Sequence, residues 1–322
     1  MKILHLFSSK VFAGLERHIE ELSFEQSKNH EVVVIGPERF KHKFRADYTT
    51  INTNQWRYSP LLWLELRDAM ARINPEVVHT HGQKMTNFIK ADLHFSTIHG
   101  TKKNVAAFKK TQFIFGASKK SLEQIPQQKS MVLENWVDES RFSNFEQKPP
   151  EYFLYIGRFE PVKNPERLIR AWNPEYGKLL MVGSGQLEKD LIVLIKQLGL
   201  SNTIELHSEI DDVGSLLSKA HALIISSDRE GSPKVLYEAL YCKVPVLSTD
   251  CGNIAEVLPN ESIAETNDKS FQHLLEKWVG KINELSLLQK NCFNQVKSKN
   301  LLSIQTQKVN SKYQEFLSIA SR

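Results

Sequence analysis

The chain alternates short apolar segments with helical patterns, and this alternation starts twice. Near the amino end, Lys2–Phe7 and Glu31–Ile35 are predicted strands that flank a helix from about residue 14 to residue 28. After the proline-containing segment 147–150 the pattern begins again, with a predicted strand over Tyr152–Ile156. Strands separated by helices predict parallel sheets with right-handed crossovers. We therefore expect an α/β protein with two doubly wound domains facing a central cleft.

The length of 322 residues also favours two domains, because it exceeds that of most single cores. We expect a first domain over residues 1–148 and a second over 149–300. Residues 301–322 are predicted to form a terminal helix that could return to the first domain. Further strands are predicted at 77–79, 95–98, 113–115, 131–133, 178–182, 203–206, 222–225 and 244–247. Further helices are predicted at 60–72, 165–172, 186–198, 213–219 and within 271–322.

Composition and cysteines narrow the class of protein. Apolar residues make up 41% and charged residues 25%, as in an ordinary globular protein. No apolar stretch approaches the roughly 18 residues of a membrane-spanning helix, and the apolar start is too short for the core of a signal peptide. Cys242, Cys251 and Cys292 are odd in number and lack metal-type spacing. We expect a cytoplasmic protein without a disulfide framework.

The net charge of +5 is concentrated in the first half. Residues 1–148 contain 22 Lys and Arg against 16 Asp and Glu, whereas the remainder contains 20 against 21. A solvated face is one interpretation; an anionic acceptor or a peripheral contact with the inner face of the plasma membrane is the other. Nucleic acid is disfavoured because no aromatic residues interleave with the charges. The lysines that crowd this half are Lys84, Lys90, Lys102, Lys103, Lys109, Lys110, Lys119 and Lys120.

Two carboxylates lie eight positions apart where a predicted strand leads into a helix. Glu230 follows the apolar segment Ala222–Ile225, and Glu238 falls inside the next helix. Ligands of open parallel sheets bind at this carboxyl edge. Ser232 is a preferred N-cap and Pro233 a preferred first helical residue, so this helix start is a candidate phosphate site. Carboxylates beside a phosphate site would repel the ligand unless they bind its hydroxyl groups. A ligand with both phosphates and hydroxyls, such as a sugar nucleotide, is therefore suggested.

Basic residues and glycines follow other predicted strands. Arg158 and Lys163 could together neutralise a diphosphate, although ordinary surface cations are the simpler interpretation of an isolated pair. Gly183 lies in a turn where glycine lets backbone approach a ligand. Gly14 opens the first helix, but the three spaced glycines of the dinucleotide fingerprint are absent, which disfavours a nicotinamide enzyme.

Four histidines cluster near predicted strand ends: His79, His81, His94 and His99. Metal binding is one interpretation of such a cluster. A structural or partly exposed role is favoured, since that is the commoner role of histidines near strand ends. No metal site is therefore expected.

Six motifs in their order resemble retaining glycosyltransferases of family 4, the glycosyl transferases of group 1, which have the GT-B fold of two Rossmann-like domains. The resemblance covers residues from about 1 to 260 and is most specific from 157 to 256. It implies transfer of a sugar from a nucleotide donor, a UDP-sugar or a GDP-sugar, to a glycan or glycolipid hydroxyl in bacterial cell-surface polysaccharide or lipopolysaccharide synthesis. The acceptor would dock on the first domain and the donor on the second. The motifs are the glycine loop at Gly14 and residues 96–100, 133–138, 157–163, 182–185 and 230–238.

The resemblance also implies residue roles. Arg158 and Lys163 would hold the donor diphosphate, and Glu230 and Glu238 would bind hydroxyls of the sugar and of the ribose. His99 would lie beside the transferred sugar. No metal or other cofactor is implied, because fixed cations and a helix start stabilise the leaving group. The implied catalytic residues are Glu230, His99, Arg158 and Lys163. The implied donor-binding residues are Gly14, Arg158, Lys163, Gly183, Ile210, Glu230, Gly231, Ser232, Pro233, Lys234, Val235 and Glu238, with the base near 207–210.

Some motifs depart from the family pattern. Ala13 stands where the first loop usually has a second glycine, and Trp136 stands where the family has Gly in Asn-Gly-Val-Asp. Ser232 and Pro233 replace Phe-Gly in the Glu-Gly-Phe-Gly run. These changes leave the charged residues in place and bear on the identity of the donor sugar. The alternatives are a sugar-nucleotide epimerase or phosphorylase of the same fold, and a non-catalytic nucleotide-sugar-binding subunit.

Overall fold

The structure is a computed structural model that describes residues 1–56, 58–100, 102, 104–208 and 212–320. The chain divides into two compact units: unit 1 comprises Met1–Asn135 with Leu302–Arg322, and unit 2 comprises Trp136–Leu301. The division falls before the predicted boundary at residue 148, because residues 136–148 contribute to unit 2. Val137 and Phe142, for example, are buried in the unit 2 core. The terminal helix belongs to unit 1.

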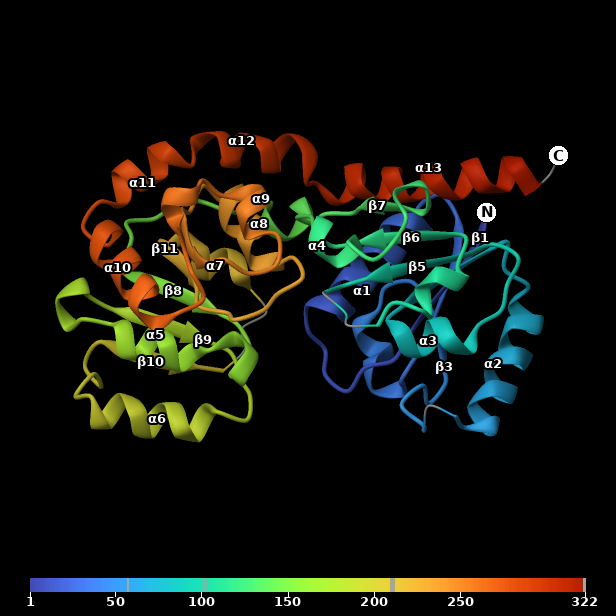
Figure 1. Ribbon diagram of the computed structural model, residues 1–322, viewed down its shortest axis with the longest axis horizontal. Coiled ribbons are helices and arrows are strands. Elements are labelled where there is room, and N and C mark those ends of the chain that lie inside the picture. Colours follow the sequence, from blue (N-terminus) through green and yellow to red (C-terminus); the bar gives the residue numbers. More distant parts are fainter. Residues whose placement is uncertain (57, 101, 103, 209–211, 321–322) are drawn as a thin grey trace. The chain divides into compact units, whose positions relative to one another are not determined.

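Unit 1 is built on a seven-stranded sheet in the order β3-β2-β1-β4-β5-β6-β7, and neighbouring strands run parallel (Figure 1). The strand order reverses between β1 and β4. The strands are β1 (Lys2–Phe7), β2 (Glu31–Gly36), β3 (Asp47–Thr50), β4 (Val77–His81), β5 (His94–Ile98), β6 (Phe113–Gly116) and β7 (Ser130–Val132). The α-helices of this unit are α1 (Gly14–Ser27), α2 (Pro60–Ile73), α3 (Gln83–Phe88), α4 (Lys119–Leu122) and α13 (Leu302–Ala320).

Local sequence explains several of these elements. Residues 3–7 of β1 are all buried, as expected of a central parallel strand covered on both faces. Helix α2 begins where Ser59 Oγ accepts the N–H of Leu62 at 3.2 Å, and it ends at Asn74, whose φ of 49° stops the helix. Gln26 interrupts the apolar stripe of α1, yet its side chain is fully buried.

Unit 2 is built on a six-stranded parallel sheet in the order β10-β9-β8-β11-β12-β13. Its strand order reverses between β8 and β11. The strands are β8 (Tyr152–Ile156), β9 (Leu179–Val182), β10 (Ile204–His207), β11 (Ala220–Ile225), β12 (Val246–Thr249) and β13 (Ile263–Ala264). The α-helices are α5 (Pro165–Ala171), α6 (Glu188–Gln197), α7 (Val213–Ser218), α8 (Lys234–Tyr241), α9 (Ile254–Val257), α10 (Asp268–Trp278), α11 (Ile282–Leu288) and α12 (Lys290–Lys299).

The predicted α/β class and the two doubly wound sheets are confirmed. Two strands were not predicted, β3 and β13. The β3 segment reads Asp-Tyr-Thr-Thr and lies at an edge of its sheet, so it lacks the apolar run that marks a central strand. Among the described residues, no helix combines the length and the apolar character that crossing a membrane requires.

Candidate active site

The reversal of strand order in unit 2 brings two loops to the same edge of the sheet. The loop after β8 carries Arg158 and Lys163, and the loop after β11 carries Glu230. Because β8 and β11 are parallel neighbours, both loops leave at the carboxyl edge. In open α/β sheets the crevice at such a reversal is where ligands bind. The fold therefore gathers three of the residues singled out in the sequence at the preferred ligand position.

Lys163 and Glu230 form an ion pair at this edge. The ammonium of Lys163 binds Oε1 of Glu230, and Ser227 Oγ donates to the same oxygen at 2.8 Å. The side chains are 20% and 11% exposed, respectively. Since water reaches the pair only in part, its attraction is screened less than that of a pair on the open surface. The carboxylate is thereby fixed in orientation, and its second oxygen, Oε2, can accept a hydroxyl.

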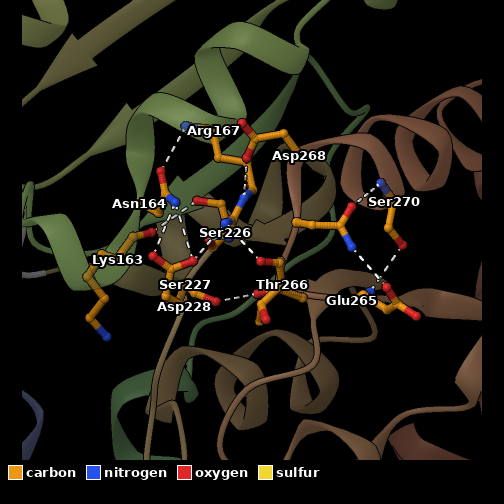
Figure 2. A network of polar contacts seen from close by, with 12 residues as sticks. Lys163, Asn164, Arg167, Ser226, Ser227, Asp228, Glu265, Thr266, Asp268 and Ser270 are labelled. Atoms are coloured by element: carbon orange, nitrogen blue, oxygen red, sulfur yellow. Dashed lines mark hydrogen bonds and ion pairs between the residues drawn. The ribbon is translucent and has the colours of Figure 1, made fainter.

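A polar network centred on Arg167 joins the two loops (Figure 2). The guanidinium of Arg167 is buried and binds Asp228 at 2.7 Å and Asp268 at 2.9 Å. It also donates to the carbonyl oxygen of Ser226 at 3.0 Å. Ser226 Oγ in turn donates to the carbonyl oxygen of Lys163 at 3.1 Å. The network therefore positions the backbone on either side of the Lys163–Glu230 pair.

Asn164 connects this network to the start of α5. Its φ of 43° places it in the left-handed region, and its Oδ1 accepts the N–H of Arg167 at 3.1 Å. Its Nδ2 donates to Asp228 at 3.2 Å. Sequence reasoning had not assigned a role to Asn164, Arg167 or Asp228. The Asn-Pro pair at 164–165 was the available signal, because asparagine at the N-cap followed by proline marks a helix start.

Arg158 is more open to solvent than Lys163. Its Nη1 binds Glu160 Oε1 at 2.5 Å, and these side chains are 35% and 31% exposed. Ion pairs of this exposure contribute little to stability. Because the guanidinium has five N–H donors in a planar fork, Arg158 can bind Glu160 and still present donors to a phosphate.

Helix α8 begins one residue later than predicted. Pro233 is its N-cap, with φ −69° and ψ 122°, and not its first helical residue. Ser232 was expected to be the N-cap; its Oγ instead donates to Tyr237 Oη at 3.3 Å. The first N–H groups of an α-helix have no carbonyl partner within the helix. In α8 these include the N–H groups of Lys234 and Val235. The start of α8 thus keeps the geometry of an anion site.

Trp136 departs from the family pattern for a packing reason. Its side chain is fully buried. The ammonium of Lys234 donates to the carbonyl oxygen of Trp136 at 2.9 Å and lies 5.7 Å from the centre of the indole ring. The charge of Lys234 is therefore used within unit 2, and only the backbone of Lys234 belongs to the candidate anion site.

Glu238 has a partner that sequence reasoning missed. Arg141 Nη1 lies 2.8 Å from Glu238 Oε1, and the Glu238 side chain is only 4% exposed. A buried carboxylate requires such a cation, because burial without one is costly. The two residues are 97 positions apart, so no local pattern could have paired them. Arg141 binds Oε1 of this carboxylate.

Two glycines are required by packing between loops. A Cβ on Gly183 would lie 2.0 Å from the carbonyl oxygen of Gly157. Gly252 has a φ of +62°, and a Cβ there would lie 2.6 Å from the carbonyl oxygen of Gly231. The sequence interpretation assigned Gly183 to the approach of a ligand, whereas the structure shows the approach of the neighbouring backbone.

Gly14 and His99 belong to unit 1. Gly14 is the first residue of α1, and a Cβ there would meet no described atom within 4 Å, so packing does not require glycine. His99 follows β5, where burial and the positive charge of Lys102 lower the pKa of His99 to about 3. Ile210, predicted to contact the base, lies outside the described residues.

The fold class that these two units define is GT-B. The complex of Anabaena Alr3699/HepE with UDP-glucose matches this chain with a TM-score of 0.84 and 15% identity, over 98% of this chain and 100% of that one. The lipopolysaccharide outer core galactosyltransferase WaaB in its apo form matches with a TM-score of 0.73 and 18% identity, over 100% of both chains. At these identities the likeness establishes the fold alone.

Sequence comparison points to a particular family. The pattern of Glycosyl transferases group 1 matches residues 137–291, just under half of the chain. The matched segment contains Lys163, Glu230 and Glu238, so the site of unit 2 falls within it.

Curated relatives are glycosyltransferases. The GalNAc-alpha-(1->4)-GalNAc-alpha-(1->3)-diNAcBac-PP-undecaprenol alpha-1,4-N-acetyl-D-galactosaminyltransferase of Campylobacter jejuni is 33% identical over 131 residues, 38% of this chain and 35% of that protein. The O-antigen chain mannosyltransferase RfbU of Salmonella typhimurium is 28% identical over 159 residues, 47% of this chain and 45% of that protein. The chain spans less than half the length of these relatives.

Proposed function

We propose that this protein is a retaining glycosyltransferase that moves a sugar from a nucleotide-sugar donor to a hydroxyl acceptor without a metal cofactor. The observation that carries the proposal is the Lys163–Glu230 pair at the strand-order reversal of unit 2, within the segment similar to group 1 glycosyltransferases. A cation and a fixed carboxylate at one edge suit a ligand with both phosphates and hydroxyls.

Each group has a task in the transfer. The diphosphate gains negative charge as it leaves, and Arg158, Lys163 and the start of α8 stabilise that charge. Glu230 binds hydroxyls of the sugar, on which positive charge builds during bond cleavage. Glu238 binds the ribose. From unit 1, His99 contacts the transferred sugar as a neutral imidazole, and Gly14 allows backbone to approach the diphosphate.

Release of nucleoside diphosphate tests the reaction class. A thermal-shift screen of UDP-, GDP- and ADP-sugars first identifies the donor. With that donor, we expect diphosphate release that depends on an acceptor, and a product with the donor's anomeric configuration by NMR. Conversion of the sugar nucleotide without an acceptor would instead indicate an epimerase, and donor binding without turnover would indicate a non-catalytic subunit.

The relatives support a class of donor and a class of acceptor. The solved Anabaena protein binds UDP-glucose, and the Campylobacter relative is named for an undecaprenol-diphosphate glycan. We therefore assign a UDP-sugar as the first donor to test, with a GDP-sugar second. The acceptor is a glycan or lipid-linked hydroxyl in the synthesis of bacterial cell-surface polysaccharide, reached from the cytoplasmic side of the membrane.

An exposed apolar surface of unit 1 supports contact with the membrane. Trp56, Tyr58 and Trp63 are 69%, 67% and 48% exposed, respectively, and Leu61 and Leu64 of α2 are also exposed. Tyr58 and Trp63 border a pocket of about 620 Å³ whose lining includes two lysines. Aromatic rings beside cations are typical of surfaces that enter the headgroup region. The full lining is Tyr58, Ser59, Pro60, Trp63, Lys84, Asn87, Phe88 and Lys90.

Sedimentation with liposomes tests this membrane contact. The wild-type protein is expected to bind vesicles that contain anionic lipid and to be released as salt rises, because the surface potential is screened. Trp56→Ser combined with Trp63→Ser should reduce binding at least tenfold. Leu287→Ser is the matched control, since Leu287 is 72% exposed in unit 2. Equal binding by the double variant would contradict the assignment of this surface.

A further inference from the structure

Three imidazoles converge at the carboxyl edge of the unit 1 sheet. His18 extends from α1, His81 ends β4, and His99 follows β5. Each offers one ring nitrogen, and the three nitrogens lie within 4.8 Å of one another. His81 Nδ1 and His99 Nε2 are 3.1 Å apart. The rings of His18 and His99 are perpendicular, with centroids 4.7 Å apart, so they approach the same point from different directions.

A directed chain of hydrogen bonds determines which nitrogen of His81 carries the lone pair. Gln26 Nε2 donates to Asn310 Oδ1 at 2.7 Å, which leaves Gln26 Oε1 as an acceptor. His5 Nε2 must therefore donate to that oxygen, at 2.7 Å. His5 Nδ1 is then an acceptor, and it accepts from His81 Nε2 at 3.0 Å. As a result, His81 Nδ1 presents its lone pair toward His99 Nε2.

His18 is oriented in a similar way. Its Nδ1 lies 3.1 Å from Asn135 Oδ1, an oxygen that can only accept, so Nδ1 carries a proton and the neutral form of the ring has its lone pair on Nε2. Metal-binding histidines usually donate their other ring N–H to an oxygen or a further polar group, which sets the tautomer and the ring orientation. Both His18 and His81 have this second partner.

The type of side chain in the cluster suits a transition-metal ion, because imidazole nitrogen is a ligand that such ions prefer. Three imidazoles are a known ligand set for zinc in proteins, with water or substrate as the fourth ligand.

We propose that His18 Nε2, His81 Nδ1 and His99 Nε2 bind a divalent transition-metal ion of the zinc type. Binding requires His99 to move its proton from Nε2 to Nδ1, and the ion then replaces the hydrogen bond between His99 and His81. No net proton is released and no redox change occurs. The ion is an inhibitor and not a cofactor, because it occupies His99; this consequence rests on the proposed function, which places His99 beside the sugar.

A second trio, His5, His79 and His81, also brings three nitrogens within 4.8 Å. It is a hydrogen-bonded core and not a metal site. His79 Nδ1 bonds Tyr313 Oη, and His79 Nε2 bonds Thr97 Oγ1 at 2.7 Å. Both nitrogens of His5 are engaged as well. A metal there would break several buried hydrogen bonds.

Calorimetry on the whole 322-residue chain, freed of metal, with ZnCl₂ tests the site without reference to activity. We expect one zinc ion per chain, bound at least tenfold more weakly by His18→Gln. Gln26→Leu, which removes the anchor of the hydrogen-bond chain, should weaken binding about 10- to 100-fold. His273→Gln is the control, since the His273 side chain is 81% exposed and should leave affinity unchanged. Circular dichroism establishes that each variant is folded.

Two outcomes would overturn the site. One is no saturable zinc binding by the wild-type protein. The other is wild-type zinc affinity in both His18→Gln and Gln26→Leu when these variants are folded. Replacement of Zn²⁺ by Co²⁺ identifies the ligands, because a thiolate charge-transfer band would assign the ion to cysteine instead. Zinc binding without inhibition of an active enzyme would refute the placement of His99 at the sugar, while the metal site would stand. Zinc binding by a protein with no transferase activity would refute only the proposed function.

Discussion

Lys163 and Glu230 bind each other although 67 positions separate them in the chain. The sequence suggested separate tasks for them, a cation for the diphosphate and a carboxylate for the sugar. In the structure they form one unit, which the Arg167 network holds from both loops. The positive charge of Lys163 and the negative charge of Glu230 neutralise each other. A nucleotide-sugar phosphate that binds Lys163 therefore also changes the electrostatic environment of the Glu230 carboxylate.

This coupling predicts a non-additive pair of mutations. Lys163→Met and Glu230→Gln are each expected to lower kcat/KM about 100-fold or more, because each removes charge stabilisation of the transition state. The double variant should lose less than the product of the two factors, since residues that act as a unit are non-additive. Steady-state release of nucleoside diphosphate is the measurement, with exposed Lys189→Met as control. If the loss of kcat/KM in the double variant equals the product of the two single losses, the two residues act independently.

Arg141 is expected to stabilise unit 2 through Glu238. Arg141→Leu leaves a buried carboxylate without its cation, which should lower the free energy of unfolding by about 3 kcal/mol. Adding Glu238→Gln should recover part of that loss, because the stranded charge is gone. Urea unfolding followed by tryptophan fluorescence is the measurement, with exposed Arg170→Leu as control. A change of less than about 0.5 kcal/mol in Arg141→Leu would contradict the assignment.

Two glycines are expected to respond oppositely to alanine. Gly183→Ala forces backbone apart at Gly157 and should lower Tm by more than about 4 °C. Gly14→Ala has open space and a helical position, so its Tm should stay equal or rise slightly. If a diphosphate approaches Gly14, the same variant binds the donor more weakly. Thermal melts and donor titrations are the measurements; equal Tm losses in both variants would refute the packing argument.

The buried histidines predict that unit 1 loses stability in mild acid. Burial lowers the pKa of His94 from 6.5 to about 4. The unfolded chain therefore binds a proton between pH 6.5 and 4 that the folded chain does not. The free energy of unfolding falls as pH falls through this window, by about 1.4 kcal/mol per pH unit for each such group. Above pH 6.5 neither state binds the proton, so this dependence is absent there.

A single substitution isolates this effect. His94→Gln should reduce the pH slope by about 1.4 kcal/mol per pH unit between pH 6.5 and 4, measured by urea unfolding at several pH values. His273→Gln should leave the slope unchanged, since that side chain is exposed. The same slope in both variants would mean that His94 is protonated in the folded state.

Much of the architecture was predictable because it is written in local patterns. The strands over 2–7 and 152–156 were predicted with the bounds that the structure has, since continuous apolar runs mark central parallel strands. Strand β3 was missed because an edge strand needs no such run. The start of α8 was placed one residue early because Ser232 has the propensity of an N-cap, while its hydroxyl bonds Tyr237 in the folded protein.

By itself, the sequence determined the two α/β units and the loops that carry Arg158, Lys163 and Glu230, because apolar periodicity and strand-helix order are local properties. Only the tertiary structure decided which side chains meet. The pairing of Glu238 with Arg141 and the convergence of His18, His81 and His99 join segments far apart in the chain. Such contacts arise because the order of the strands in the sheet brings loops that are distant in sequence to one sheet edge. Burial of an unpaired polar group is costly, which favours pairing among the side chains that meet there.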